Sequence, residues 1–204
     1  MIKNLTIVTL RKPHIADFAK ERNQAMRKIK TDWVLFVDSD ETITQSLKKE
    51  IQTAIQNKSS NYQLKRQDYF LNQRLRFGET SRVRLIRLIQ RGTGQWNGRV
   101  HEVFQSQLPV KTLKHPLHHQ RNLSLADFLD RLNQYTTIRA QELHAHQHHF
   151  CLFELLFYPP LKFIQNYFLR LGFLDGLPGL AMALMMSLHS LMVRIKLYEL
   201  KKAS

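Results

Sequence analysis

Two carboxylates one residue apart directly follow an apolar run near the start of the chain. Residues 33–37 read Trp-Val-Leu-Phe-Val, and Asp38, Ser39 and Asp40 come next. Such a run is typical of a strand buried on both faces, and ligands of open α/β sheets bind where the strands end. Because strand side chains alternate, Asp38 and Asp40 are expected on one side, where two oxygen ligands suit Mg²⁺ or Mn²⁺ bound with substrate phosphates. A turn stabilised by Asp side chains is the alternative interpretation.

Arginines and histidines supply the other chemically useful clusters. The guanidinium forks of Arg82, Arg84, Arg87 and Arg91 suit phosphate oxygens, although a solvated strand face would explain each of them equally well. His144 and His148 have the four-residue spacing of a metal pair on a helix, but no Cys or acidic partner lies in register, so a solvated helix face is preferred. The remaining histidines of these clusters are His115, His118, His119, His146 and His149.

The elements around these residues alternate at first between strand and helix. Strands are predicted at residues 5–10 and 33–37, and amphipathic helices at about 17–29 and 47–55. From residue 62 to residue 89 short extended pieces predominate. The pattern predicts an α/β fold with a mixed sheet flanked by helices.

The charge of the chain implies an anionic partner. Lysine and arginine number 31 against 16 acidic residues, which gives a formal charge of +15. Nucleic acid, an acidic membrane surface and phosphorylated substrates all fit this charge. No recognisable RNA- or DNA-binding motif is present, so no nucleic-acid partner is expected. The single cysteine, Cys151, excludes an internal disulfide and fits a reducing compartment.

The composition changes near residue 150. From there to residue 200 Leu, Phe, Met and Tyr predominate, and the nearly apolar stretch 177–193 is of borderline length for a membrane span. Residues 155–174 mix large apolar side chains with Lys162 and Arg170, as in a helix at the headgroup level. Peripheral or re-entrant attachment is therefore preferred over a bundle core or a true span. The apolar part of residues 1–10 is too short for a signal peptide, which predicts a cytoplasmic start.

Four motifs in order along the chain resemble the family-two glycosyltransferases, and within them the branch of lipopolysaccharide-core β-glucosyltransferases. They are the segments 18–23 (Phe-Ala-Lys-Glu-Arg-Asn), 32–41 around Asp38-Ser39-Asp40, 98–102 (Gly-Arg-Val-His-Glu) and 172–176 (Gly-Phe-Leu-Asp-Gly). The resemblance implies a GT-A, Rossmann-like sheet. It divides the chain into a catalytic core at 1–115, a connecting segment with an amphipathic helix at 116–149, and an apolar membrane-associated region at 150–204.

The same resemblance assigns roles on the donor side. Asp38 and Asp40 match the DXD motif, which holds Mg²⁺ or Mn²⁺ on the donor diphosphate. Arg22 and Asn23 match helix residues that line the nucleotide. Arg84 and Arg87 resemble the arginine-rich strand near the diphosphate.

On the acceptor side the resemblance points to Glu102 and His101. An inverting transfer needs a base within hydrogen-bond reach of the attacking hydroxyl. Glu102 matches the family's His-Glu element and is the preferred candidate. His101 is the alternative base, or a contact to metal or phosphate, and a structural ion pair is the remaining interpretation.

The implied function is inverting transfer of a sugar from a nucleotide-diphosphate donor to a lipid-linked or lipopolysaccharide-type acceptor. The expected location is the cytoplasmic face of a bacterial inner membrane, against an anionic lipid surface. The family's first, nucleoside-binding strands have no counterpart here, so the core is expected to be N-terminally shortened. A truncated gene or start site, a minimal variant that completes its sheet as a homo-oligomer, and a donor smaller than usual are the three explanations. The alternative function is a catalytically degenerate, basic membrane-binding module or a subunit of a larger transferase.

Overall fold

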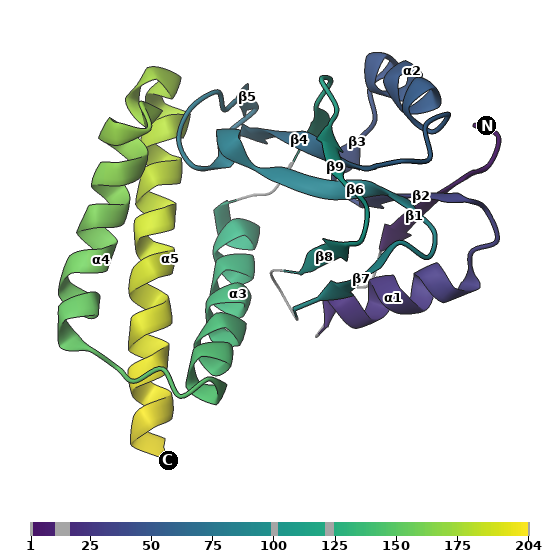
Figure 1. The fold of residues 1–204 in the computed structure, drawn as a ribbon. Coiled ribbons are helices and arrows are strands. Elements are labelled where there is room, and N and C mark those ends of the chain that lie inside the picture. The colour runs from purple at the N-terminus through teal and green to yellow at the C-terminus, as the bar shows by residue number, and fades with distance from the viewer. Residues whose placement is uncertain (1, 11–16, 99–101, 121–124, 204) are drawn as a thin grey trace. The chain divides into compact units, whose positions relative to one another are not determined.

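The chain folds into two compact units, each built around its own core. The computed structural model shown in Figure 1 describes residues 2–10, 17–98, 102–120 and 125–203. Unit 1 comprises Met1–Asp68 and Arg82–Gln120, and unit 2 comprises Tyr69–Ser81 and Arg121–Ser204. These limits differ from the predicted ranges, because the segment after Asp68 shares a hydrophobic core with the C-terminal helices.

Unit 1 is organised around a mixed sheet. β1 (Leu5–Leu10) and β2 (Trp33–Asp38) run parallel, and β6 (Arg84–Gln90) lies antiparallel between β2 and β4 (Asn61–Phe70). The order continues through β10 (Leu117–Gln120) to β3 (Glu41–Thr42), and β9 (Val110–Thr112) pairs with the start of β4. β7 (Gly94–Asn97) and β8 (Val103–Ser106) form a separate antiparallel pair. The predicted mixed α/β sheet with flanking helices is confirmed.

β2 supplies both faces of the sheet with core residues. Leu35 and Val37 pack in the cluster that contains Leu47 of α2 (Gln45–Ala54). Phe36 packs on the other face, in the cluster that contains Ala19 of α1 (Phe18–Lys28). Figure 1 shows α1 and α2 on opposite faces of the sheet. Because strand side chains alternate, Asp38 at the end of β2 emerges on the α1 side with Phe36.

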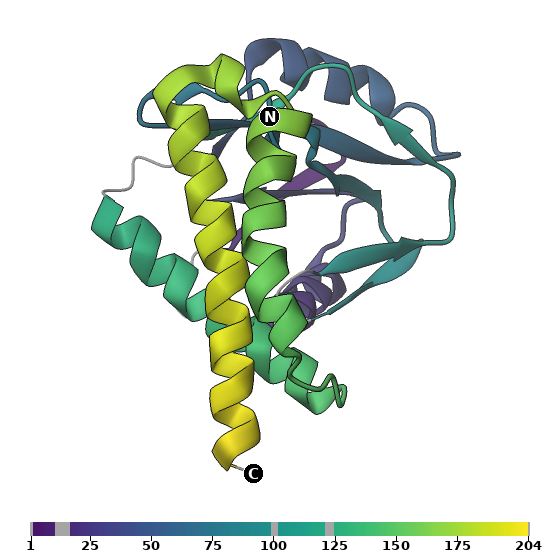
Figure 2. The same ribbon diagram turned by 90° about the vertical axis from the view of Figure 1, so that its left-hand side faces the viewer.

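Unit 2 is a helical assembly. It contains α3 (Leu125–Ala145), α4 (Leu152–Ile164), the π-helical turn η2 (Gln165–Leu169), the 3₁₀ turn η3 (Gly172–Asp175) and α5 (Gly176–Ala203). Both α3 and α4 pack along α5, as Figure 2 shows. The core joins Phe70 and Leu75 to Phe128 and Leu132 of α3 and to a methionine-rich side of α5. Short pieces complete the two units: β5 (Gln73–Arg74) pairs with the end of β4, and η1 (Thr80–Arg82) precedes β6.

The C-terminal helix has the dimensions of a membrane span. Within the described part of the chain, one stretch, Gly172–Lys202, is long and apolar enough to cross a bilayer, with a mean hydropathy of 1.5. Core helices of soluble proteins meet the same criterion when they are largely buried. Only 28% of the most apolar segment of this stretch is buried. Much of the apolar surface of the helix is therefore uncovered.

Asn61 provides a test of how the strands of unit 1 are held together. Its fully buried amide donates to Thr93 Oγ1 at 2.9 Å and to Ser106 Oγ at 2.7 Å, and accepts from the Gln90 backbone at 2.8 Å. Asn61→Ala leaves these buried partners unsatisfied, so we expect the free energy of unfolding to fall by about 3 kcal/mol. Urea titration measures this change, with exposed Gln52→Ala as a control expected to shift stability by less than about 0.5 kcal/mol. Equal stability of the two variants would contradict the assignment.

Candidate functional site

The centre of the candidate site is a carboxylate held between two guanidinium groups. Arg22 Nη2 donates to Asp38 Oδ1 at 2.9 Å, and Arg87 Nη2 donates to Asp38 Oδ2 at 2.5 Å. The three residues come from α1, β2 and β6, which meet on the α1 side of the sheet. Two arginines, 16 and 49 residues from Asp38 along the chain, therefore converge on one carboxylate.

The two guanidinium groups are buried, whereas the carboxylate is partly open to solvent. Arg22 is 1% exposed and Arg87 is 3% exposed, but a third of the Asp38 side chain is accessible. The Arg22 guanidinium also lies over the rings of Phe36 and Trp96, at 5.1 and 4.9 Å from their centroids. Buried charges persist only when they are paired, so these contacts explain how a helix of unit 1 can bury an arginine.

Two more carboxylates extend this network. Arg22 Nε donates to Glu102 Oε1 at 3.0 Å, so one guanidinium joins Glu102 to Asp38. The backbone N–H of Asp38 donates to Glu41 Oε2 at 2.8 Å, and Glu41 Oε1 lies 3.6 Å from Arg87 Nη2. Three carboxylates thus surround two guanidinium groups, which leaves one negative charge in excess when all are ionised.

The network shifts the pKa values of its members in opposite directions. Burial raises the pKa of Asp38, but the charges and hydrogen bonds of Arg87 and Arg22 outweigh it and hold that pKa below its ordinary value. Burial, with help from the Asp38 charge, raises the pKa of Glu41 despite Arg87. Burial lowers the pKa of Arg22, and the charge of Arg87 lowers it further. Asp38 is therefore the firmly ionised carboxylate of the site.

Asp40 lies in a different environment from Asp38. β2 ends at Asp38, and Ser39 and Asp40 form a turn, so strand alternation does not govern where Asp40 points. Its Oδ2 lies 3.4 Å from Nε2 of the buried His119. His119 Nδ1 is hydrogen-bonded to Asp68, and Asp68 Oδ1 lies 3.0 Å from Arg66 Nε. Asp38 is thus paired with arginines, whereas Asp40 lies beside a histidine.

The sequence analysis gave no role to His119 or Asp68. β10 pairs with β3 so that His119 is opposite Glu41, which brings this strand beside the residues that follow Asp40. In the structure His119 is buried on the same side of β10 as Leu117, as strand alternation requires, whereas His118 is only partly buried. The pairing of β3 with β10 was not readable from the sequence, because it joins segments more than seventy residues apart.

The remaining predicted site residues lie in several environments. The Asn23 amide donates to Trp96 O at 2.9 Å and accepts from Trp96 N at 3.0 Å, which ties α1 to β7. Arg84 has an exposed side chain at the start of β6. His101 lies outside the described residues. The roles assigned to these residues, and to Glu102, stay predictions.

A polar cavity of about 440 Å³ opens beside Asn23. Its lining combines α1 with the end of β7 and contributes both charged and amide groups. The polar side chains that line it are those of Asp17, Lys20, Asn23, Gln24, Arg27 and Asn97. Their mixture of cationic groups and hydrogen-bonding amides suits a polar, anionic ligand rather than an apolar one.

The donor set fits a divalent cation that is shared with a phosphorylated ligand. Within the described ranges, no three acidic, His or Cys side chains form a complete metal cage. Mg²⁺ commonly takes only one or two carboxylates and fills its other positions with water and substrate phosphates. A cation at Asp38 would lie beside two guanidinium groups, which repel it, so Asp40 is the better placed ligand. Arg22 Nη1 and Arg87 Nε are buried and lack a hydrogen-bond acceptor among the described residues, so the site has spare donors for an anion.

Neutralising Asp38 should destabilise the protein in a pH-dependent way. Asp38→Asn leaves two buried guanidinium groups less well paired, so we expect the free energy of unfolding to fall by about 2 kcal/mol at neutral pH, a value reduced for the partial exposure of Asp38. Because the folded-state pKa of Asp38 is depressed, its stabilisation is present above about pH 4 and is lost as the pH falls further. Urea titrations of both proteins should therefore converge in acid. A constant difference across this range would contradict the ion-pair assignment.

Comparisons with known proteins place the chain in a family. The chain is 22% identical over 187 residues to the lipopolysaccharide core biosynthesis glycosyltransferase LpsC of Rhizobium meliloti (strain 1021), an alignment that covers 89% of this chain and 69% of the relative. The sequence profile of glycosyl transferase family 2 matches residues 2–109, which include β2, Asp38, Asp40 and Glu102. Because this match spans more than half of the chain and contains the whole carboxylate–guanidinium network, the chain belongs to glycosyl transferase family 2.

Proposed function

We propose that this protein transfers a sugar, with inversion, from a nucleotide-diphosphate donor to a hydroxyl of a lipid-linked or lipopolysaccharide-type acceptor. Membership of glycosyl transferase family 2 supports glycosyl transfer, and the name of the R. meliloti relative points to a lipopolysaccharide acceptor. The observation that carries the proposal is the Arg22 guanidinium, which joins Asp38 of the DXD motif to Glu102. The cytoplasmic face of a bacterial inner membrane is the location where such donors and acceptors meet.

On the donor side, the proposal assigns the diphosphate to the arginines and the DXD motif. Asp40 would hold Mg²⁺ or Mn²⁺, with Asp38 beside it, and the cation would offset the charge that develops on the departing diphosphate. Arg22 and Arg87 have spare buried N–H groups that suit phosphate oxygens, and the exposed Arg84 lies on the same strand as Arg87. Asn23 lines the polar cavity, which suits the nucleotide.

On the acceptor side, the proposal makes Glu102 the general base. Its carboxylate is fixed by Arg22 Nε, and 13% of its side chain remains accessible. In a single displacement the base removes the proton of the acceptor hydroxyl as the oxygen attacks the anomeric carbon on the face opposite to the diphosphate. The shared guanidinium keeps the base and the diphosphate side of the site at a fixed separation.

The buried network favours this enzymatic function over a purely membrane-binding module. Taking Arg22 and Arg87 out of water is costly, and apolar residues of similar size would stabilise a structural core at least as well. A binding module has no use for such an arrangement. A site that stabilises developing negative charge depends on preorganised donors of this kind.

Removing the Asp40 carboxylate should abolish metal-dependent donor binding. We expect Asp40→Asn to weaken the Mn²⁺-dependent affinity for nucleotide sugars by about 100-fold, because the cation loses a charged ligand. Isothermal titration calorimetry with a panel of nucleotide sugars, with and without Mn²⁺, measures this affinity. The exposed Glu199→Gln is the matched control and should bind as the wild type does. Donor binding that is unchanged in Asp40→Asn would sink the metal assignment.

Replacing Glu102 by glutamine should slow catalysis without weakening donor binding. The glutamine oxygen can still accept the Arg22 Nε hydrogen bond, so the network is kept while the base is lost. We expect kcat to fall by about 10²- to 10⁴-fold, with the donor affinity changed by less than about threefold. Steady-state kinetics with a lipid-linked acceptor and calorimetry with the donor separate the two effects. A variant that keeps its full kcat would exclude Glu102 as the base.

A further inference from the structure

Exposed apolar side chains and two exposed arginines lie together on one surface of unit 2. η2, η3 and the start of α5 contribute Leu169, Leu171, Phe173, Leu174 and Leu177, of which Leu169 is 73% and Leu177 70% exposed. The hairpin between β4 and β5 contributes Leu71, also more than half exposed. We call this set the apex surface. An exposed apolar patch of this kind marks an interaction site rather than ordinary surface.

Hydrogen bonds hold an arginine-bearing segment against the apex surface. The buried Asp175 carboxylate of η3 accepts the backbone N–H groups of Arg76 and Phe77, at 3.0 and 2.9 Å, and Gly78 N donates to Arg170 O at 2.9 Å. The side chains of Arg74 and Arg76 are exposed and form no ion pair within the described part of the chain. Two uncompensated positive charges thus border the apolar side chains.

Two leucines of the apex surface lie in tight turns. Leu71 has φ 50° and Leu171 has φ 57°, a left-handed conformation that glycine and asparagine adopt more easily than leucine. Both leucines are exposed, so their side chains add to the apolar surface and do not fill the core.

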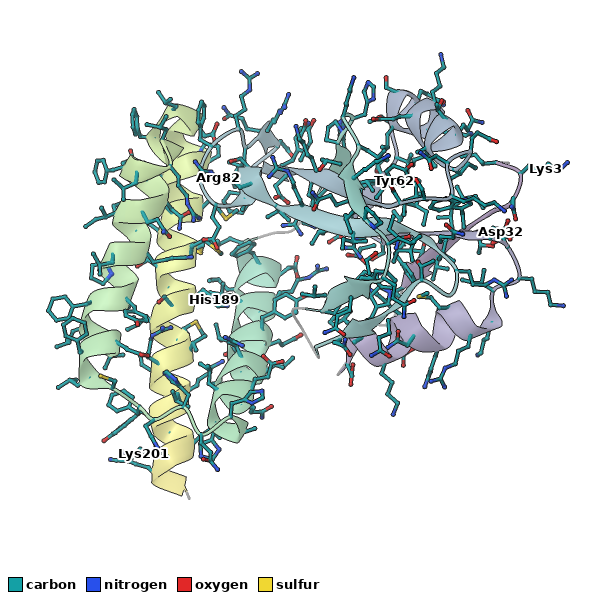
Figure 3. The ribbon with its side chains drawn as sticks, in the orientation of Figure 1. Lys3, Asp32, Tyr62, Arg82, His189 and Lys201 are labelled. Carbon is teal, nitrogen blue, oxygen red and sulfur yellow. The ribbon has the colours of Figure 1, made fainter. Side chains whose placement is uncertain are left out.

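The apolar surface continues along α4. Phe153, Phe157, Leu161 and Ile164 recur at helical spacing and are all more than 40% exposed. Figure 3 shows rings projecting from α4 on the side away from α5. The outer face of α4 and the apex surface therefore both expose leucine and phenylalanine side chains, and arginines lie next to them. Interfacial membrane-binding helices have this composition.

The packing of α3 decides against a membrane-spanning α5. Lys196 of α5 donates to Asn133 O at 2.6 Å and to Thr136 Oγ1 at 2.9 Å, which fixes α3 along the helix. α3 exposes polar side chains such as Asp130 and Gln134. If α5 crossed a bilayer, these groups would enter the hydrocarbon, where each charged side chain is strongly unfavourable.

We propose that the apex surface and the outer face of α4 dock unit 2 in the plane of an anionic lipid bilayer, with Arg74 and Arg76 at the level of the lipid phosphates. Leucine and phenylalanine side chains would enter the acyl boundary, and the arginines would supply the electrostatic part of the affinity. This inference deepens the proposed function, because an acceptor anchored in a membrane has to be reached from the membrane surface.

Vesicle flotation of the full chain tests the apolar part of the proposal. The wild type should float with vesicles of phosphatidylcholine and phosphatidylglycerol, and more weakly with phosphatidylcholine alone. Leu174→Glu with Leu177→Glu should lower binding by at least about tenfold, because two charges enter the acyl boundary. The matched control is Leu125→Glu, an equally exposed leucine of α3 that should leave binding unchanged. Unchanged binding in the double variant would overturn the proposal.

A second pair of variants tests the charged part. Arg74→Gln with Arg76→Gln should weaken binding to the anionic vesicles by roughly 30-fold, about fivefold for each charge, and should leave binding to neutral vesicles unaltered. Lys201→Gln with Lys202→Gln is the matched control, because Lys201 lies at the other end of α5 (Figure 3). An equal loss in both pairs would show that net charge alone acts, and would overturn the assignment of the surface.

Three further readouts separate the alternatives. If Leu174→Glu with Leu177→Glu converts a dimer to a monomer in analytical ultracentrifugation while vesicle binding persists, the occupant is a second copy and the proposal fails. Alkaline carbonate should release the protein from membranes, and its retention would favour a span instead. Calorimetry with Mn²⁺ and nucleotide sugars should give wild-type affinities in all these variants. Absent donor binding with intact vesicle binding would refute the proposed function while supporting this inference.

Discussion

The pairing of Asp38 with Arg22 and Arg87 is the interaction on which the rest of unit 1 depends. Two guanidinium groups can be buried in this core because Asp38 pairs with both of them, and Glu102 and Glu41 supply the remaining negative charge. Their position in turn fixes α1 and β6 relative to β2, and the second contact of Arg22 fixes Glu102. A single electrostatic constraint therefore sets both the packing on one face of the sheet and the geometry of the candidate site.

The two neighbouring carboxylates after the apolar run differ in their surroundings. Asp38 is part of a buried ion-pair network, whereas Asp40 lies in a turn beside His119. Under the proposed function, Asp38 would organise the donor N–H groups and Asp40 would be the cation's ligand, because a cation at Asp38 would be repelled by two guanidinium groups.

Unit 2 follows a different physical logic. Its core is made where α5 meets α3 and the segment around Phe70 and Leu75, yet α4 and the turns after it leave large apolar side chains uncovered. Many of the apolar side chains of unit 2 are therefore not part of its core. If the acceptor is membrane-anchored, as proposed, such an uncovered apolar surface would serve to hold the protein at the bilayer.

Much of this could be predicted from the sequence, because local patterns carry it. The apolar run 33–37 determined a doubly buried strand, the periodicity of residues 17–29 and 47–55 determined α1 and α2, and the ordered motifs determined the family. Tertiary structure alone decided the partners of the side chains. Arg22 and Arg87 converge on Asp38, Arg22 also holds Glu102, and His119 reaches Asp40, through strand pairings and helix packing that local sequence patterns do not record. Charges and hydrogen bonds act over a few ångströms in space, whereas sequence periodicity reports only on neighbours along the chain. The sequence therefore predicted the carboxylates but not which of them would pair with the arginines.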